Sequence, residues 1–231
     1  MTYEILGDGN TQVQYPDDAW ELISPRLTDE RRAKMLAVAG GRSEHIRLVL
    51  QDIYDPHNIS ACMRSAEAFG ILNIDIVNTY QRFTKPSTVS KGSYNWLEIN
   101  HSKSIADSIA AYKDAGYKIA GGFPNADCNL DDLPIDKPVA VIFGNEKRGV
   151  SSEWDEAIDY RFTIPMTGMV ESLNISVSAA LSMYTLSQRA KRSLKEADYY
   201  LNEERKTRLL NKWICRQSPR FESELSRLRA P

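Results

Sequence analysis

Short apolar runs alternate with helical patterns along the middle of the chain. Four runs rich in Ile and Val predict buried strands, namely IRLVLQDI (46–53), IDIVNTY (74–80), KIAGGF (118–123) and VAVIFG (139–144). The apolar residues are continuous rather than alternate, which is typical of parallel strands covered by helices on both faces. The pattern therefore predicts an α/β domain with a mostly parallel sheet.

Helical patterns accompany these strands. Helices are predicted after Asn58 and Ser104, near Ser151, and from Ser172 to about Leu194. Each begins at a residue whose polar side chain can accept a hydrogen bond from the first turn.

Both ends of the chain differ from the middle. Thr28 is a predicted N-cap for a helix that runs to about Val38, whereas residues 1–25 lack periodicity and predict a loosely ordered or extended leader. A C-terminal helix is predicted from Asp198 to about Arg216, and its apolar side consists of Leu201, Leu209, Leu210, Trp213 and Ile214.

Charge is distributed unevenly. Residues 187–231 hold twelve Lys or Arg against six Asp or Glu, so this end carries +6 and the rest of the chain −8, for a total of −2. A basic extension on an acidic body is common in proteins that bind a polyanion, although a solvated helix surface explains it equally well.

Composition favours a cytoplasmic globular protein. No apolar run approaches the roughly 20 residues that span a bilayer, and the N-terminal residues lack the order of a secretory signal. The cysteines Cys62, Cys128 and Cys215 are far apart and without C-x-x-C spacing, so they are expected to be reduced thiols rather than a metal site.

Polar residues gather where predicted strands end. After the first strand, DPHNISACMRSAEAFG (55–70) places Asn58 as a predicted helix N-cap and Arg64 among small and apolar side chains. An Arg in such surroundings needs an anionic partner, which Glu67 or a bound ligand can supply.

A second junction follows the strand 139–144, in VAVIFGNEKRGVSSE (139–153). Gly144 and Gly149 allow the backbone to approach a ligand closely. Glu146 lies at the strand tip, where α/β enzymes place active groups, although a charged surface loop is the simpler alternative.

The third junction is IPMTGMVESLNISVSAAL (164–181). Pro165 ends a strand, Gly168 permits an unusual backbone, and Ser172 begins a predicted helix with Asn174 just inside it. Such a loop predicts a pocket for a flat heterocycle, with apolar contact from Met166, Met169 and Leu173.

Common nucleotide and hydrolase signatures are missing from the sequence. It contains no G-x-G-x-x-G, no G-x-x-x-x-G-K-[ST] and no G-x-S-x-G, and its three histidines stand in no triad-like context. Dinucleotide-binding, P-loop and serine hydrolase classes are therefore disfavoured.

In order, the motifs N-I-S-A-x-x-R-S-A-x-A-x-G, V-I-F-G-N-E-K-x-G-V-S and I-P-M-x-G-M-V-x-S-L-N-I-S-V-S-A-A resemble those of the SpoU branch of the SPOUT RNA 2′-O-methyltransferases. The resemblance runs from about residue 31 to 215. It implies an α/β SPOUT fold, a mostly parallel sheet with a C-terminal deep trefoil knot, flanked by N- and C-terminal helical extensions. The corresponding segments are a leader and accessory helix (1–44), the catalytic domain (45–194) and a basic extension (195–231).

Within that branch the chain is most similar to the enzymes that methylate guanosine 18 of tRNA. About 45 residues precede the first strand, too few for the extra N-terminal domain of relatives that act on ribosomal RNA. The alternatives are another position in tRNA, ribosomal RNA, or a non-catalytic RNA-binding paralogue.

The resemblance also implies a cofactor, partners and site residues. It implies S-adenosyl-L-methionine as cofactor, tRNA as substrate, a homodimer, and no metal. The implied catalytic residues are Asn58, Arg64, Glu146, Ser172 and Asn174. The implied cofactor-binding residues are Gly122, Gly144, Gly149, Ile164, Met166, Gly168 and Leu173. The implied RNA-binding residues are Arg31, Arg32, Lys34, Arg189, Lys191, Arg192 and Lys195, with further basic side chains at Arg205, Lys206, Arg208 and Lys212.

The chemistry constrains these roles. A ribose 2′-hydroxyl is a weak nucleophile that must lose its proton during attack, and an Arg with a pKa above about 12 is a poor acceptor for that proton. Arg64 is therefore expected to hold the hydroxyl and its neighbouring phosphate, with phosphate or water taking the proton. Glu146 is expected to fix Arg64 or the turn, and the remaining polar residues to orient the ribose and the loop.

Overall fold

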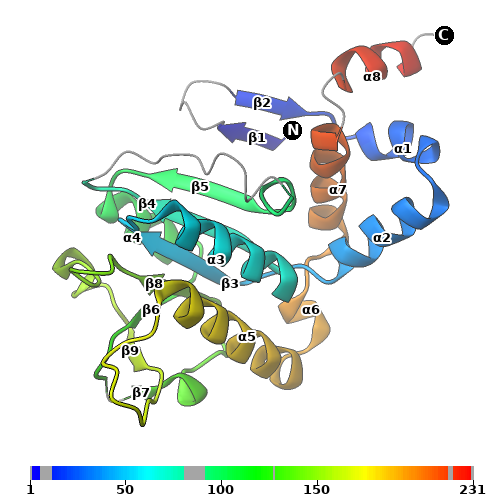
Figure 1. Cartoon of the computed structure of the whole chain (residues 1–231). Coiled ribbons are helices and arrows are strands. Elements are labelled where there is room, and N and C mark those ends of the chain that lie inside the picture. The colour runs from blue at the N-terminus through cyan, green and yellow to red at the C-terminus, as the bar shows by residue number, and fades with distance from the viewer. Residues whose placement is uncertain (1, 6–11, 81–91, 127, 218–220, 230–231) are drawn as a thin grey trace. The chain divides into compact units, whose positions relative to one another are not determined.

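The structure is a computed structural model that describes residues 2–5, 12–80, 92–126, 128–217 and 221–229. The chain forms two compact units (Figure 1). The larger unit is Ser43–Tyr199, and the smaller one combines the residues up to Arg42 with those from Tyr200 onward.

The larger unit is built on a parallel sheet, as the apolar runs predict. Within the described residues the strand order is β5-β4-β3-β8-β6-β9-β7, and every neighbouring pair is parallel. The strands are β3 (Ser43–Gln51), β4 (Ile71–Val77), β5 (Glu98–Ser102), β6 (Lys118–Gly122), β7 (Cys128–Asn129), β8 (Val139–Phe143) and β9 (Tyr160–Thr163).

Helices cover both faces of this sheet (Figure 1). On one face, α3 (Pro56–Phe69) packs on β4, and α5 (Ile175–Ser193) packs on β3 and α3. On the other face, α4 (Ile105–Asp114) lies beside the 3-10 turn η4 (Ser152–Trp154). The rings of Tyr112 and Trp154 are stacked there, with their centroids 6.2 Å apart. The short elements η2 (Tyr94–Trp96), η3 (Leu130–Asp132) and α6 (Glu196–Tyr199) complete the unit.

Two predicted helix starts are wrong by a few residues. Asp55, not Asn58, is the N-cap of α3, because its carboxylate accepts from the His57 amide at 2.8 Å. Asn174, not Ser172, is the N-cap of α5. Both shifts release Asn58 and Ser172 from capping.

Of the two other helices predicted in this unit, one is confirmed and one is shorter than predicted. The N-cap of α4 at Ser104 is confirmed, whereas only the single turn η4 follows Ser151. Trp154 in that turn is fully buried and packs against α4 in the hydrophobic core, and the chain does not continue as a helix after it.

The smaller unit replaces the predicted leader with regular structure. It contains the antiparallel pair β1 (Thr2–Ile5) and β2 (Gln12–Tyr15), then α1 (Ala19–Ile23), η1 (Ser24–Arg26) and α2 (Asp29–Gly40), which Thr28 caps as predicted. From the other end of the chain come α7 (Glu203–Gln217) and α8 (Phe221–Arg229). The predicted single helix 198–216 is divided between α6 and α7, with a break at residues 200–202, and the predicted apolar side chains on α7 are buried.

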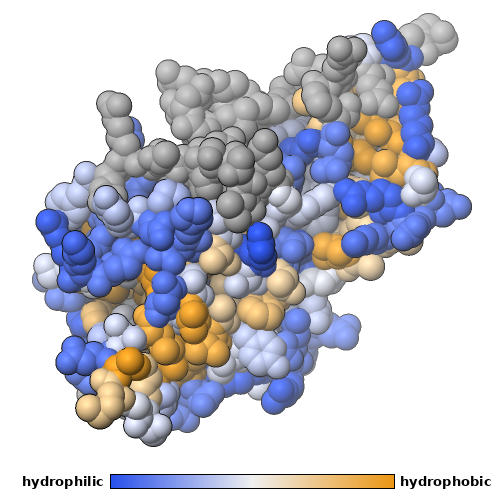
Figure 2. Space-filling view, in the orientation of Figure 1, coloured by the Kyte–Doolittle hydropathy of each residue, from blue (hydrophilic) through white to orange (hydrophobic). Residues whose placement is uncertain are grey.

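Exposed hydrophobic side chains gather on the face of the larger unit over α3 and α5 (Figure 2). Val177, Leu181 and Tyr184 lie at helical spacing along α5 and are each 40% or more exposed. The ring of Tyr184 packs against Phe69 of α3 at 5.4 Å. This set, the α5 stripe, leaves an apolar surface that the isolated chain does not cover.

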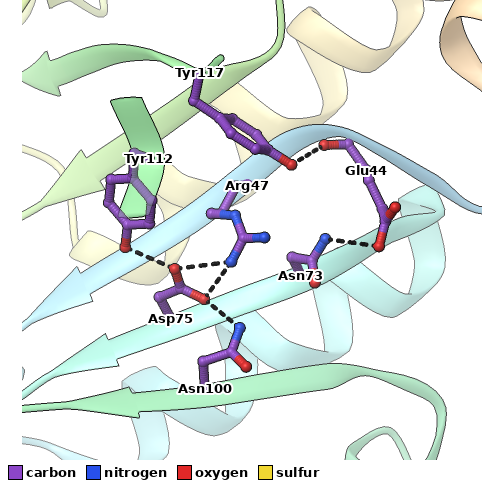
Figure 3. Close-up of polar contacts among 7 residues, drawn as sticks. All are labelled: Glu44, Arg47, Asn73, Asp75, Asn100, Tyr112 and Tyr117. Carbon is purple, nitrogen blue, oxygen red and sulfur yellow. Dashed lines mark hydrogen bonds and ion pairs between the residues drawn. The ribbon is translucent and has the colours of Figure 1, made fainter. Parts of the chain in front are cut away.

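A polar network lies on the sheet beneath α4 (Figure 3). We name Arg47, Asp75, Asn100 and Tyr112 the inner cluster. Arg47 Nη1 donates to both carboxylate oxygens of Asp75 at 2.8 and 2.9 Å, while Tyr112 Oη and Asn100 Nδ2 donate to them at 2.6 and 2.8 Å. Burial, followed by the charge of Asp75, raises the pKa of Tyr112, which therefore remains a neutral donor.

Several general features of the described residues bear on function. No helix among them is long and apolar enough to cross a membrane. The three cysteines are free, and no three His, Cys, Asp or Glu side chains in this part of the chain cluster so as to hold a metal ion.

Candidate active site

The candidate site lies at the carboxyl edge of the sheet, where β3 and β8 end side by side. These strands are paired in parallel, with Leu50 opposite Phe143. The turn after β8, residues 144–149, is therefore next to the segment that leads from β3 into α3. Ligands of open α/β sheets bind at this edge.

A chain of hydrogen bonds joins three of the predicted site residues, and we name Asn58, Glu146 and Asn174 the edge cluster. Asn174 Nδ2 donates to Asn58 Oδ1 at 3.1 Å, and Asn58 Nδ2 donates to Glu146 Oε1 at 3.0 Å. The second oxygen, Glu146 Oε2, accepts from the Tyr54 amide at 3.3 Å. One residue from each of the three sequence junctions thus belongs to one network.

The start of α5 fixes the direction of this chain of hydrogen bonds. Asn174 Oδ1 accepts from the amide and hydroxyl of Ser176 at 2.8 and 2.6 Å, so the nitrogen of its amide group must face Asn58. The oxygen of Asn58 then faces Asn174, and its nitrogen faces the Glu146 carboxylate. The helix cap therefore determines how both amides are oriented.

The turn after β8 is closed by its own contacts. Asn145 Oδ1 accepts from the amides of Lys147 and Arg148 at 2.9 and 3.2 Å, and the Gly149 amide donates to Asn145 O at 2.8 Å. A Cβ on Gly144 would lie 2.1 Å from the carbonyl group of Gly149, whose φ is +70°. Both glycines are thus required by the turn itself, apart from any ligand.

Asp52 anchors this edge, and the sequence reading missed it. Its φ of 50° is left-handed, and its carboxylate accepts from the Thr79 and Tyr80 amides at 2.7 and 3.2 Å. Its carbonyl accepts from Asn145 Nδ2 at 2.8 Å. An Asp directly after an apolar strand was an available signal, because Asp tolerates left-handed backbone and binds nearby amides.

The loop after β9 contains several of the residues predicted to bind the cofactor. Thr163 Oγ1 donates to Pro124 O at 2.8 Å, which ties this loop to the one after β6. Ile164, Met166 and Leu173 are half-buried, so each still presents apolar surface to solvent. Partly exposed apolar side chains of this kind are typical of the surface that contacts a flat heterocycle.

The predicted cofactor-binding glycines differ in their surroundings. A Cβ on Gly122 would lie 2.8 Å from Phe143 Cε1, so this glycine makes room for an aromatic ring within the protein. Gly168 is exposed and has open space around it.

Two predicted catalytic residues lie outside the edge cluster. Arg64 and Ser172 are exposed, and neither makes a hydrogen bond or ion pair with another residue in the described part of the chain. Arg64 is thus exposed rather than enclosed by apolar side chains, and it does not pair with Glu67, which was one of the two anionic partners expected for it. Glu146 fixes Asn58 and the Tyr54 amide rather than Arg64.

The predicted RNA-binding residues also differ among themselves. In the larger unit Lys191, Arg192 and Lys195 are exposed, whereas Arg189 Nη1 donates to the carbonyls of Leu130 and Leu133 at 3.2 and 2.9 Å. Arg189 therefore holds η3 in place.

Similar differences occur in the smaller unit. There Arg32 and Lys34 are exposed, and Arg31 Nη2 donates to Gln217 Oε1 at 3.0 Å. Lys212 is only 3% exposed, which rules it out as a surface contact.

The arrangement supports positioning more than nucleophilic catalysis by the protein. Cys62 is the nearest thiol, but burial, followed by the charge of Glu146, raises its pKa to about 12. It therefore stays protonated. What the edge offers is oriented amides, a carboxylate whose two oxygens each accept one hydrogen bond, and a neighbouring loop with apolar side chains.

The SpoU rRNA Methylase family matches residues 45–184, the span that contains all three junctions. The chain belongs to this family of methyltransferases, which confirms the resemblance read from the motifs. A tRNA (guanosine(18)-2′-O)-methyltransferase of Borreliella burgdorferi is 34% identical over 83% of this chain and 88% of its own. A 23S rRNA (guanosine-2′-O-)-methyltransferase, RlmB of Nitrosomonas europaea, is 33% identical over 74% of this chain and 68% of its own.

Solved structures agree with the fold. The TrmH/SpoU tRNA modifying enzyme of A. aeolicus has a TM-score of 0.73 and 25% identity, covering 82% of this chain and 97% of its own. The SpoU methyltransferase AviRb of Streptomyces viridochromogenes, solved with the cofactor AdoMet, has a TM-score of 0.59 and 26% identity, covering 66% and 63%. The predicted α/β architecture with a parallel sheet and flanking helices is confirmed.

Proposed function

We propose that this protein transfers a methyl group from S-adenosyl-L-methionine to a ribose 2′-hydroxyl of RNA, with guanosine 18 of tRNA as the target. The observation that carries the proposal is the edge cluster, which joins the three family motifs through Asn58, Glu146 and Asn174. The relatives that act on guanosine 18 support the target, and the similarity to a 23S rRNA enzyme makes ribosomal RNA the second candidate.

The cofactor, when bound, supplies a methyl group already activated by its sulfonium. The chain's own residues then have to place the hydroxyl in line with it, and positioning of this kind lowers a barrier substantially. Ile164, Met166 and Leu173 would hold the adenosine, while the edge cluster keeps its loop fixed against α3. The Tyr54 amide and Asn58 hold the Glu146 carboxylate in one place, which suits it to positioning.

Arg64 is the proposed contact to the hydroxyl and its phosphate. It lies six residues after Asn58 on α3, so the two side chains point about 120° apart around the helix. One chain alone therefore does not bring Arg64 onto its own edge cluster. A second copy packed on the α5 stripe would cover the exposed Val177 and Leu181, and it would supply its own Arg64 to this site. We therefore propose a homodimer.

The proposed trefoil knot concerns the path of the chain from β9 to α5. In the sheet, β9 is separated from β3 by β6 and β8, yet the helix that follows β9 packs on β3 and α3. The segment from Ile164 to Asn174 thus has to cross the carboxyl edge. Pulling the chain from both ends should stop short of its full length if this crossing threads a loop.

The deciding experiment is to map 2′-O-methylation on total RNA from cells with and without the gene. Loss of methylation at guanosine 18 of tRNA supports the proposal, loss at a ribosomal position moves the target, and no change contradicts the activity. In the purified protein, Arg64→Ala should lower methyl transfer by about 100-fold or more and leave cofactor affinity, measured by calorimetry, within a few fold. Arg64→Lys is the matched control, because it keeps the charge and loses the planar fork.

A further inference from the structure

Two tyrosines stand out at the rim of the candidate site. Tyr54, between β3 and α3, is 74% exposed, and Tyr80, after β4, is 68% exposed. An aromatic ring this exposed forgoes the burial that normally stabilises it, so two of them at one edge need an explanation.

Their backbones are held firmly although their rings face solvent. The Tyr54 amide donates to Glu146 Oε2, and the Tyr80 amide donates to Asp52 Oδ1. Asp52 is only two residues before Tyr54, so both rings project from neighbouring points of one anchored edge. Rings on a fixed backbone lose little conformational entropy when something stacks on them.

Positive charge accompanies the rings. The guanidinium of Arg148 lies over the Tyr80 ring, with Cζ 5.5 Å from its centroid, and both Arg148 and Lys147 are exposed. The carboxylates of Asp52, Asp55 and Glu146 at this edge keep their negative charge, but amide donors hold them in place. The surface therefore combines two aromatic rings with a guanidinium and an ammonium group that are exposed to solvent.

We propose that Tyr54, Tyr80 and Arg148, which we name the tyrosine rim, form a stacking platform for an unpaired nucleobase of the RNA substrate. Bases stack on aromatic rings and guanidinium planes, and a nearby positive charge attracts the adjoining phosphate. An enzyme that needs one ribose of a folded RNA has to take nucleotides out of their stack, and the rim replaces the stacking that they lose. This inference rests on the proposed function, and it adds residues that the methyl transfer itself does not use.

Leucine and phenylalanine variants separate ring stacking from mere apolar contact. Initial rates are measured with labelled S-adenosyl-L-methionine at saturation, against increasing total RNA from cells that lack the gene. Tyr54→Leu and Tyr80→Leu should each raise the KM for RNA about tenfold, as expected for loss of one base stack. Tyr54→Phe and Tyr80→Phe should stay within about twofold of the native protein, because the ring is retained.

Salt dependence separates the charge from the rings. Arg148→Ala should weaken RNA binding and reduce the slope of log affinity against log salt by about one, whereas the leucine variants leave that slope unchanged. Lys137→Ala is the matched control, since Lys137 is exposed but precedes β8 at the opposite edge of the sheet. It should change neither the slope nor the KM.

The outcomes are distinguishable. If the native protein labels no RNA, the proposed function fails and the tyrosine rim fails with it. If the native protein labels RNA and the leucine variants match it in KM, only the rim is overturned. Phenylalanine variants as impaired as the leucine ones would also overturn it, since a hydroxyl and not a ring would then be making the contact.

Discussion

The inner cluster and the edge cluster are polar networks of similar size in the same unit, yet their surroundings are opposite. In the inner cluster Asp75 and Tyr112 are buried, and four hydrogen bonds saturate one carboxylate. In the edge cluster Glu146 and Asn174 are exposed, and hydrogen bonds run in a single line from a helix cap to a strand tip.

The difference shows what each network can do. A buried carboxylate that accepts four hydrogen bonds from the protein is fixed in position, and its bond from Tyr112 holds α4 to the sheet. The exposed hydrogen bonds among Asn174, Asn58 and Glu146 hold the loops after β8 and β9 against α3 and remain accessible to solvent. Removing a member should therefore damage stability in the first case and activity in the second, and the following predictions test that division.

The largest expected effect is on the inner cluster. Asp75→Ala leaves the Arg47 guanidinium without its anionic partner in a mostly buried position, which should lower the free energy of unfolding by about 3–5 kcal/mol. Urea unfolding followed by circular dichroism measures it.

The matched control is the double variant Arg47→Met with Asp75→Leu, which removes both charges. It should be less destabilised than Asp75→Ala. Equal destabilisation of the two would mean that packing, not the unpaired charge, sets the cost.

The next effect is on the rate at the edge cluster. Glu146→Gln replaces one acceptor by a donor, so the contact to Asn58 or to the Tyr54 amide is lost. We expect kcat to fall about 100-fold through misplacement of the site, with little change in unfolding free energy. A variant that keeps its kcat but unfolds at much lower urea would reverse the assignment of the two clusters.

A smaller effect separates the two roles of Asn174. Asn174→Ala removes the helix cap and should cost about 1 kcal/mol of unfolding free energy, while Asn174→Asp keeps the cap acceptor. The Asp variant nevertheless loses the donor to Asn58, so both variants should lose activity and only Ala should lose stability. Full activity in Asn174→Asp would show that the link to Asn58 is dispensable.

The smallest expected effect is a pH dependence of folding stability. It comes from His45, which belongs to neither cluster. Burial lowers the pKa of His45 below its ordinary 6.5, and its Nε2 lies 2.8 Å from Ile135 O. A lowered pKa means that the folded state binds the proton less well, so stability is retained above pH 6.5 and lost as the pH falls below it. The slope should stay under about 1.4 kcal/mol per pH unit and shrink in His45→Gln.

Sequence patterns predicted the sheet well and the helix starts in part, because the caps at Thr28 and Ser104 are confirmed and those at Asn58 and Ser172 are wrong. The four apolar runs became β3, β4, β6 and β8, because a strand buried on both faces has to be continuously apolar. β5 was missed because it lies at the sheet edge, where only Ile99 is buried. Asn58 looked like a cap because its residue type suits a cap, yet Asp55 precedes it and Pro56 suits the first helical position.

The candidate site was predicted as a set of residues but not as a network. Motif order placed Asn58, Glu146 and Asn174 together, and the hydrogen bonds join them. Asp52 escaped notice because its role depends on a left-handed backbone and on amides 27 and 28 residues away. The exposure of Arg64 depends on which helix packs on α3, and that is decided by long-range contacts that periodicity does not encode.

The cap of α5 contains a backbone amide, that of Ser176, whose hydrogen exchange can report on the site although Ser176 takes no part in the chemistry. The Ser176 amide is protected only while Asn174 Oδ1 accepts from it, and that same contact sets which way the Asn58 amide faces Glu146. Hydrogen exchange at this one amide would therefore report, in the resting protein, what fraction of molecules holds the site assembled.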